Sequence, residues 1–274
     1  MIRLEDVEYF YPNGHKALDQ VRLEIEKGEV VALMGENGAG KTTLLKHLNG
    51  LLKPTRGRVL VDGIDTRKAT VAALSRKIGL VFQNAEDMFF SSTVWDEVAF
   101  SLRNFGYEEE VVKRRVEWAL KFMELDRYVD QSPFVLSGGE KKRLALAIIL
   151  AWSPDIIALD EPTTGQDQLQ KEKLMEMIKL LNMQGRTVII SSHDVEFVAQ
   201  LRPRVILMKK GKIISDGGAE EVFLDEEVLR SCNLLPPQIV SLTRRLDFLG
   251  IKPSLPHPRQ LAEEILSKLG EYKI

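Results

Sequence analysis

The sequence predicts an α/β fold with a helical insertion. A glycine-rich loop at residues 35–42 lies between an apolar run of strand length and a segment with the features of a helix. Further apolar runs of strand length end in polar residues, and α/β folds place ligand-binding groups at such strand ends. Residues 84–135 instead carry apolar residues at helical spacing without a strand signal. Together these observations predict a sheet-based core interrupted by helices.

The glycine-rich loop is the most informative stretch. It matches the Gly-x4-Gly-Lys-[Ser/Thr] pattern of a phosphate-binding loop, which ends here in Lys41 and Thr42. Its glycines let the backbone curl so that N–H groups point at an anion, and the following helix N-terminus adds partial positive charge. Lys41 is expected to reach the β- and γ-phosphates and Thr42 to ligate Mg²⁺. The alternative, a plain glycine-rich turn, is disfavoured by the strand and helix on either side.

Four polar residues follow other predicted strands. Gln83 ends the run 78–82, Asp160 and Glu161 follow the run 156–159, and His193 follows the run 187–191. A strand tip in a protein with a phosphate-binding loop is expected to hold a Mg²⁺ carboxylate, Asp160, and a water-activating base, Glu161. His193 is either a γ-phosphate contact or a solvated loop histidine. Gln83 on its own is weak evidence.

The insertion contains two segments with helical periodicity, 93–103 and 108–125. Phe89 and Phe90 lie in the loop that leads into them. An apolar pair in a loop is either part of the core or a docking surface, and we expect it to be partly exposed.

A second helix start follows the insertion. Ser137 is a good N-cap, and Gly138 and Gly139 come directly after it, before an apolar helix that ends at Ser153-Pro154. Glycine in a first turn weakens a helix unless something must come near the backbone. The pair therefore favours a second phosphate-binding helix start over an ordinary capped helix.

The composition excludes several classes of protein. The 274 residues are 44% hydrophobic and 28% charged, as in ordinary soluble proteins. The formal net charge of -2 argues against a nucleic-acid-binding protein, which would be strongly positive. The single cysteine, Cys232, excludes an internal disulfide, and we expect it to be a small buried side chain. No apolar run approaches the roughly 20 residues that cross a bilayer, and the N-terminus has no apolar signal core.

The two ends of the chain differ in character. Strands are predicted near 2–10 and 21–25, and Tyr11 precedes a turn at Pro12-Asn13-Gly14, where it either stacks on a nucleobase or packs locally. From about Val228, prolines punctuate two segments, 238–249 and 259–269, that each predict an amphipathic helix. This appendix is too small for a core of its own and must pack on the main domain or on another chain.

The ordered set of motifs resembles the ATP-binding cassette (ABC) family over residues 1 to about 225. The set comprises the phosphate-binding loop, Gln83, Leu136–Glu140, Asp160-Glu161, Gly165–Asp167 and His193. The stretch Leu-Ser-Gly-Gly-Glu is what narrows the resemblance to ABC-type ATPases. The resemblance implies a P-loop NTPase fold of the ABC type, with a mixed sheet core and an N-terminal antiparallel β subdomain. It also implies a dimer that sandwiches two ATP molecules, with Ser137, Gly138 and Gly139 acting across the interface.

The resemblance gives each matching residue a role. Tyr11 would stack on adenine, Asp167 would communicate between subunits, and Gln83 would contact Mg²⁺, the attacking water and a membrane partner. Glu161 would polarise water and His193 would hold the γ-phosphate, so that these two and Gln83 are the catalytic candidates. Gln166 departs from the family, which usually has an apolar residue there. The phosphates would be held by Gly35, Asn37, Gly38, Ala39, Gly40, Lys41, Thr42 and Thr43, and Mg²⁺ by Thr42, Gln83 and Asp160.

Within the family, three stretches resemble the ATPases of energy-coupling-factor (ECF) importers of vitamins, cobalt and nickel. They are residues 82–84, 92–100 and 137–143, and the Leu235-Pro236-Pro237 stretch with its helices is similar to that subgroup as well. This resemblance implies peripheral attachment to the cytoplasmic face of the cell membrane. The implied partners are a transmembrane coupling protein, a substrate-binding membrane protein, and a second ATPase in a homodimer or heterodimer.

We therefore expect an ABC ATPase domain over 1–227, with a helical subdomain at about 86–152, and a helical appendix over 228–274 that contributes to dimerisation. The alternatives are an ATPase of another ABC transporter class and a soluble ABC ATPase outside transport. A soluble repair or chromosome ATPase would carry a long coiled coil between the two phosphate motifs, and that gap holds no sustained heptads.

Overall fold

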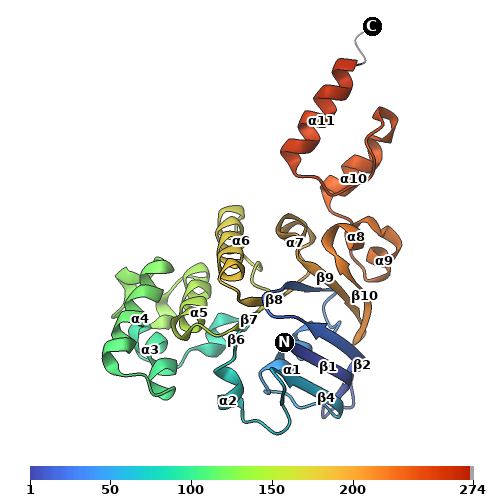
Figure 1. Cartoon of the computed structure of the whole chain (residues 1–274). Helices are drawn as coiled ribbons and strands as arrows, with labels where there is room; N and C mark the ends of the chain where they lie inside the picture. The colour runs from blue at the N-terminus through green and yellow to red at the C-terminus, as the bar shows by residue number, and fades with distance from the viewer. Residues whose placement is uncertain (272–274) are drawn as a thin grey trace.

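The computed structural model, which describes residues 1–271, contains two sheets and a separate group of helices (Figure 1). A four-stranded antiparallel sheet has the order β2-β1-β4-β5 and a six-stranded sheet the order β10-β9-β3-β8-β7-β6. The six-stranded sheet is parallel except for β10, which pairs antiparallel with β9. The strands are β1 (Ile2–Phe10), β2 (Lys16–Ile25), β3 (Val30–Met34), β4 (Arg56–Val61), β5 (Ile64–Asp65), β6 (Ile78–Val81), β7 (Ile156–Asp160), β8 (Thr187–Ser192), β9 (Arg204–Lys209) and β10 (Lys212–Gly218).

The helices fall into three groups in Figure 1: those beside the sheets, the lobe formed by α3, α4 and α5, and the C-terminal pair α10 and α11. The predicted mixed sheet, antiparallel β subdomain and helical insertion are confirmed. The helices are α1 (Lys41–Leu48), α2 (Val71–Ser75), α3 (Val94–Asn104), α4 (Glu109–Phe122), α5 (Gly138–Trp152), α6 (Gln168–Met183), α7 (Val195–Leu201), α8 (Ala219–Leu224), α9 (Glu226–Ser231), α10 (Gln238–Arg245) and α11 (Pro258–Glu271).

Strand β3 shows why its sequence is apolar throughout. Val31 and Leu33 pack into the core between the two sheets, whereas Ala32 and Met34 point into the core on the helical face. Successive strand residues point to opposite faces, so a strand covered on both sides needs apolar residues at every position. This burial fixes the strand that leads into the phosphate-binding loop.

The start of α5 is set by a capping box. The Ser137 hydroxyl accepts a hydrogen bond from the Glu140 backbone N–H, and the Glu140 carboxylate accepts one from the Ser137 backbone N–H. Glu140 also accepts a hydrogen bond from the Tyr128 hydroxyl, and these bonds lower the pKa of Glu140 to about 2. The predicted N-cap at Ser137 is confirmed, and the helix starts at a residue whose side chain is held.

The prediction for the aromatic pair is half wrong. Phe90 is 60% exposed and stacks edge-on against Phe100, but Phe89 is only 7% exposed and packs into the core of the helical lobe. Neighbouring residues in an extended loop point in opposite directions, so one aromatic turned inward and the other outward. The expected buried position of Cys232 is confirmed.

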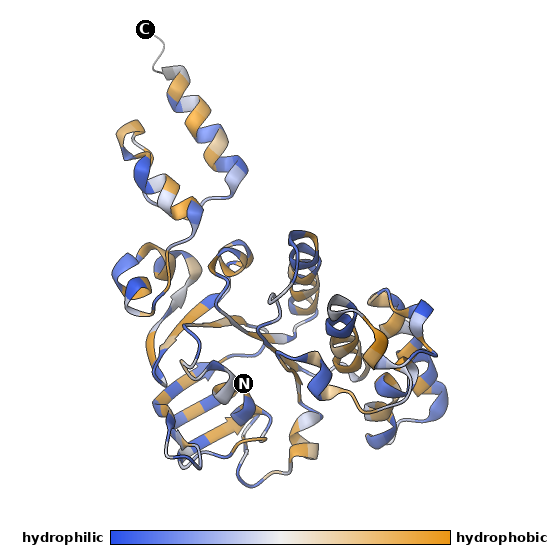
Figure 2. Ribbon diagram, turned by 180° about the vertical axis from the view of Figure 1, so that it is seen from behind, coloured by the Kyte–Doolittle hydropathy of each residue, from blue (hydrophilic) through white to orange (hydrophobic). Residues whose placement is uncertain are grey.

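Helices α10 and α11 project from the sheets at the end of the chain (Figure 2). Leu249, Ile251 and Leu261 form a small cluster of their own, whereas Leu234 and Val240 belong to the main core. Exposed apolar side chains remain in this region, among them Phe248 in the turn between the two helices and Leu266 on α11. The division of the chain near residue 228 stays a prediction.

The contact between β6 and α5 predicts a specific stability effect. A Cβ added to Gly79 would overlap the Cγ2 of Ile149 and lie 3.1 Å from the Cγ of Pro154. Ile149 is β-branched and cannot swing away, so Gly79→Ala should lower the free energy of unfolding by about 1–3 kcal/mol in urea titrations. Gly138→Ala is the control, since a Cβ there meets no atom within 4 Å and should not destabilise the chain.

A double-mutant cycle isolates this overlap. Ile149→Ala removes the atom that the new methyl would meet, so Gly79→Ala should cost much less in that background. Equal costs of Gly79→Ala in both backgrounds would contradict the proposed overlap.

Candidate active site

The site lies where three neighbouring parallel strands end. Pairing aligns Met34 of β3 with Ser192 of β8, and Ser191 of β8 with Asp160 of β7. The residues that follow these strand ends therefore emerge side by side. They are the phosphate-binding loop after β3, Glu161 after β7 and His193 after β8. In open α/β sheets this edge is where ligands bind.

The phosphate-binding loop depends on glycine at its tightest point. Gly40 has φ 106°, and a Cβ there would lie 2.6 Å from the carbonyl oxygen of Ala17. A side chain at this position would be strained and would collide with backbone. The Lys41 ammonium donates to the carbonyl oxygens of Gly35 (2.7 Å) and Glu36 (3.2 Å), so it lies within the curve of the loop.

A cavity of about 380 Å³ opens over this loop. Tyr11 borders this cavity, and its hydroxyl group forms a hydrogen bond of 3.0 Å with the Thr43 hydroxyl. The Tyr11 ring stacks on the His15 ring with a centroid separation of 6.5 Å. A half-buried tyrosine ring beside an exposed histidine ring, next to a phosphate-binding loop, is suited to a flat base. The other lining residues are Ala17, Asn37, Gly38, Ala39, Gly40, Lys41, Thr42, Thr43, Gln83 and Glu161.

Asp160 is held by two hydroxyl groups. The Thr42 hydroxyl lies 3.1 Å from the Asp160 Oδ1, and the Ser191 hydroxyl donates to the same oxygen. Thr42, Asp160 and Gln83 would together offer hydroxyl, carboxylate and amide oxygens, which is the ligand type that Mg²⁺ prefers. Among residues 1–271 no group of three His, Cys, Asp or Glu side chains could hold a metal. A single carboxylate with phosphate oxygens is the usual arrangement for Mg²⁺ beside a nucleotide.

Glu161 is the most constrained side chain of the site. Its φ of 46° is in the left-handed region, and its backbone N–H donates to the carbonyl (3.0 Å) and hydroxyl (3.1 Å) oxygens of Ser191. Backbone strain of this kind persists only where the surroundings hold it, and it is common at active sites. Glu161 is thus aimed by its backbone rather than by flexible contacts.

The Glu161 carboxylate lies between two cationic or potentially cationic groups. Lys41 Nζ is 3.4 Å from Oε1 and His193 Nδ1 is 2.8 Å from Oε2. The Oε1 atom is fully buried and accepts no hydrogen bond from any residue that the structure describes. An unsatisfied carboxylate oxygen facing a phosphate-binding cavity can accept a proton or a hydrogen bond from a water molecule.

The remaining predicted residues lie outside this cavity. Ser137 and Gly138 are exposed at the start of α5, Gly139 follows them, and Asp167 caps α6 by accepting from the backbone N–H of Gln170 (2.8 Å). The structure therefore brings together Tyr11, the phosphate-binding loop, Gln83, Asp160, Glu161 and His193, but not the residues at the two helix starts.

Three residues that the sequence analysis did not identify belong to the site or its support: His15, Ser191 and Lys142. Lys142 donates to the carbonyl oxygens of Pro162 (3.3 Å) and Thr164, which follow Glu161. Burial lowers the pKa of Lys142, although the charge of Glu161 acts to raise it. A polar residue at the end of strand 187–192 was a usable signal for Ser191, while His15 and Lys142 are recognisable only in three dimensions.

No helix within residues 1–271 is both long enough and apolar enough to cross a membrane.

Comparisons with known proteins agree with this geometry. Residues 18–164 match the family described as ABC transporter. The chain is 43% identical over 254 residues to the energy-coupling factor transporter ATP-binding protein EcfA of Methanothermobacter thermautotrophicus, which covers 92% of this chain and 82% of the relative. It is 48% identical over 254 residues to an ABC transporter ATP-binding protein of Caldanaerobacter subterraneus, and it spans only 45% of that longer relative.

Solved structures give the same result. The structure of cbiO1 from Clostridium perfringens, part of the ABC transporter complex cbiONQ, has a TM-score of 0.74 and 36% identity, over 89% of this chain and 98% of that one. The ATP-binding cassette MJ0796, in a dimeric post-hydrolysis state bound to ADP and Pi, has a TM-score of 0.73 and 34% identity, over 80% of this chain and 99% of that one. The chain therefore belongs to the ATP-binding cassette transporter family, as an ATPase of the energy-coupling-factor type.

Proposed function

We propose that this chain is the ATP-hydrolysing subunit of an ECF-type importer, taking up a vitamin or cobalt or nickel ions. The observation that carries the ATPase chemistry is the Glu161 carboxylate, buried between Lys41 and His193 at the edge of the phosphate-binding cavity. The likeness to EcfA and cbiO1 supports the importer assignment.

The residues of the cavity take separate roles. The loop amides and Lys41 bind the phosphates, and Tyr11 stacks on the adenine ring. Thr42, Asp160 and Gln83 would hold Mg²⁺, which would neutralise phosphate charge. Glu161 orients and deprotonates water, and His193 donates to the γ-phosphate. Catalysis of this kind rests on positioning and electrostatics, for which a buried and preset carboxylate is suited.

The start of α5 acts on a second subunit. Ser137 and Gly138 are exposed, and a Cβ added to Gly138 or Gly139 would meet no atom of another part of residues 1–271 within 4 Å. No contact in the described part of the protein thus requires glycine at these positions. Close approach of a bulky anion would require it, and the helix N-terminus favours that anion electrostatically. We infer that these residues close over ATP held by the partner, in a homodimer or heterodimer with Asp167 at the interface.

A groove of about 700 Å³ receives the transmembrane coupling protein. Phe90 and Phe100 are exposed on its rim and contact each other edge-on, and Leu51 is exposed nearby. The Glu97 carboxylate accepts from the backbone N–H groups of Phe90 (2.9 Å) and Ser91 (2.7 Å), so the loop is held rigid. An exposed apolar groove with a fixed shape fits a partner that docks permanently. It would place the chain on the cytoplasmic face of the cell membrane, with the substrate-binding membrane protein in the same complex.

The appendix, residues 228–274, adds to dimerisation. Exposed apolar side chains such as Leu242, Phe248 and Leu266 lie on α10, α11 and the turn between them. They supply surface that a second copy of these helices can cover.

Glu161→Gln should lower the rate of ATP hydrolysis by about 10²–10⁴-fold because it removes the base while keeping shape and hydrogen bonding. ATP affinity, measured by calorimetry, should stay close to that of the unmodified chain. Glu117→Gln on the exposed face of α4 is the matched control and should hydrolyse ATP normally. Turnover of Glu161→Gln at the control rate would remove Glu161 from the role of base.

Ser137→Arg should prevent the ATP-dependent dimer, because the long side chain fills the space that the partner's nucleotide needs. Light scattering with ATP, in the Glu161→Gln background, measures dimer formation. Ser137→Ala removes the same helix cap, at about 1 kcal/mol of stability, but adds no bulk, so its dimer should persist. A dimer that also forms with Ser137→Arg would refute action across the interface.

The transport assignment is tested by purifying the tagged chain from detergent-solubilised native membranes and identifying its partners by mass spectrometry. A multi-span membrane protein with a smaller second one is the expected result, and the smaller protein then identifies the substrate. Phe90→Glu should lose both partners, whereas Trp118→Glu, an exposed aromatic of the same lobe outside the groove, should retain them. Recovery of soluble partners alone would overturn the transport assignment and leave the ATPase chemistry intact.

A further inference from the structure

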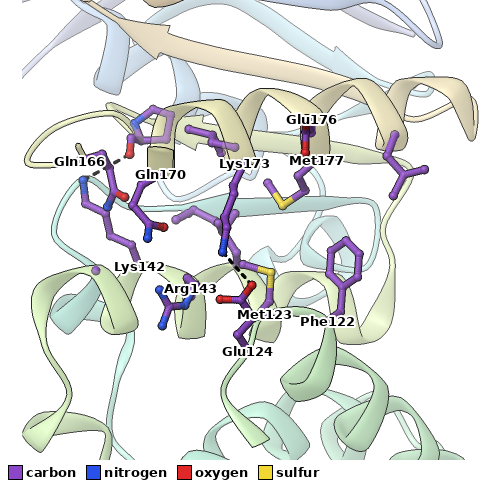
Figure 3. Close-up of a pocket in the computed structure, with 16 residues that line it drawn as sticks. Phe122, Met123, Glu124, Lys142, Arg143, Gln166, Gln170, Lys173, Glu176 and Met177 are labelled. Atoms are coloured by element: carbon purple, nitrogen blue, oxygen red, sulfur yellow. Dashed lines mark hydrogen bonds and ion pairs between the residues drawn. The ribbon is translucent and has the colours of Figure 1, made fainter. Parts of the chain in front are cut away.

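A further space, partly open to solvent, lies between the helical lobe and α6, apart from the phosphate-binding cavity (Figure 3). Its volume is about 500 Å³, within the range of small-molecule sites in proteins. It is bounded by the end of α4, the first turns of α5 and one face of α6, and it shares no lining residue with the cavity over the phosphate-binding loop. The function proposed above uses neither this space nor most of its side chains.

The walls of this space are largely aliphatic. Met123 and Leu146 come from the helical lobe, and Leu174, Met177 and Leu180 come from α6. Four of these five are buried, whereas Leu180 is 42% exposed and stands at the opening. Methionine is flexible and fills irregular gaps, so two methionines on facing walls can adapt to an apolar chain.

The cationic side chains of this space are not equivalent. Lys142 is bound to the carbonyl oxygens of Pro162 and Thr164, and Lys173 forms an ion pair with Glu124 at 2.7 Å. Figure 3 draws the contact of Lys142 with Pro162 and the ion pair of Lys173 with Glu124 as dashed lines, and none to Arg143. The Lys173 ammonium holds the pKa of Glu124 below its usual range, so Glu124 stays ionised and engaged.

Arg143 is the unusual group. It makes no hydrogen bond or contact ion pair with any side chain in the described part of the protein, although its charge acts at longer range on the carboxylates of Glu124 and Glu140. Its Nε is fully buried without an acceptor. A buried donor without a partner is destabilising, and more so when it is charged. A guanidinium at the wall of a cavity is suited to bind a carboxylate through two parallel hydrogen bonds.

We propose that this space binds an amphiphilic carboxylate, with the charged group on Arg143 and an aliphatic chain between Met123 and Met177. A neutral apolar ligand would leave the Arg143 guanidinium without a contacting carboxylate, and a small anion would leave the aliphatic walls in water. Such a ligand contacts α5 and α6 at once. It would therefore fix the spacing between the helix that begins at Ser137 and the loop that follows Glu161.

The test measures the binding of decanoate to the full chain, without nucleotide, by isothermal titration calorimetry. Decanoate should bind at one site per protein chain. Decanol, which has the same alkyl chain without the charge, should bind at least roughly tenfold more weakly. The Arg143→Gln variant should likewise bind decanoate at least roughly tenfold more weakly than the unmodified protein does. Lys41→Ala should bind decanoate normally. Loss of binding in that variant would place the probe on the phosphate-binding loop and overturn the proposal.

A second pair of variants does not depend on Arg143. Leu180→Glu places a negative charge at the opening and should weaken decanoate binding, whereas Met183→Glu makes the same kind of change on the same helix at a position 85% exposed and outside the lining. Met183→Glu should bind as the unmodified chain does. Absence of decanoate binding, or equal binding to Leu180→Glu and Met183→Glu, would refute the site.

Discussion

The parallel pairing of β3, β8 and β7 is the constraint on which the site depends. This pairing sets Met34, Ser192 and Asp160 at the same edge of the sheet, so that segments far apart in the sequence meet there. Side chains alternate along a strand, and a slip of one residue in this pairing would exchange the faces of the whole strand. Every position of β3 is apolar, so a slip would not expose an apolar side chain to water or bury a polar one. Burial therefore opposes the slip only because side chains of different size would have to exchange places. The hydrogen bonds from the Thr42 and Ser191 hydroxyl groups to Asp160 also favour this register, because a slip of one residue would break them.

The strand ends position the charged side chains of Lys41 and Glu161, and the pairing of these two charges keeps them in place before a nucleotide binds. Lys41 and Glu161 have side chains only 6% and 5% exposed, and they approach at 3.4 Å without a hydrogen bond. Burying a charge is costly unless it is paired, so each of these groups depends on the other when no phosphate is bound. A γ-phosphate near Lys41 would take over its charge and release Glu161 toward water. The left-handed backbone at Glu161 keeps the carboxylate in position during that exchange.

The sequence was sufficient wherever chemistry is encoded by neighbours along the chain. The phosphate-binding loop, the Asp160-Glu161 pair and the N-cap at Ser137 are local patterns, and each lies at the strand end or helix start that the sequence predicts. Three other residues act on partners elsewhere in the sequence. Ser191 accepts a hydrogen bond from Glu161, 30 positions away, and Lys142 donates one to Pro162, 20 positions away. The His15 ring stacks on Tyr11, four positions away, and only the fold makes these contacts visible. The two phenylalanines at 89 and 90 show a different limit, because an apolar pair in a loop does not reveal which ring turns inward. Short helices such as α2 and α7 span too few turns for periodicity to predict them.

The joint between the helical lobe and the sheets links these parts physically. Strand β6, which leads to Gln83, touches α5 so closely that only glycine fits at position 79. A few turns away along α5, Lys142 reaches the loop that follows Glu161. The helix whose first turn would contact a partner's nucleotide is thus in contact with its own subunit at two points, the start of β6 and the loop after Glu161. A ligand between α5 and α6 would act on the second of these contacts, because Lys142 and Pro162 also line the space between the two helices.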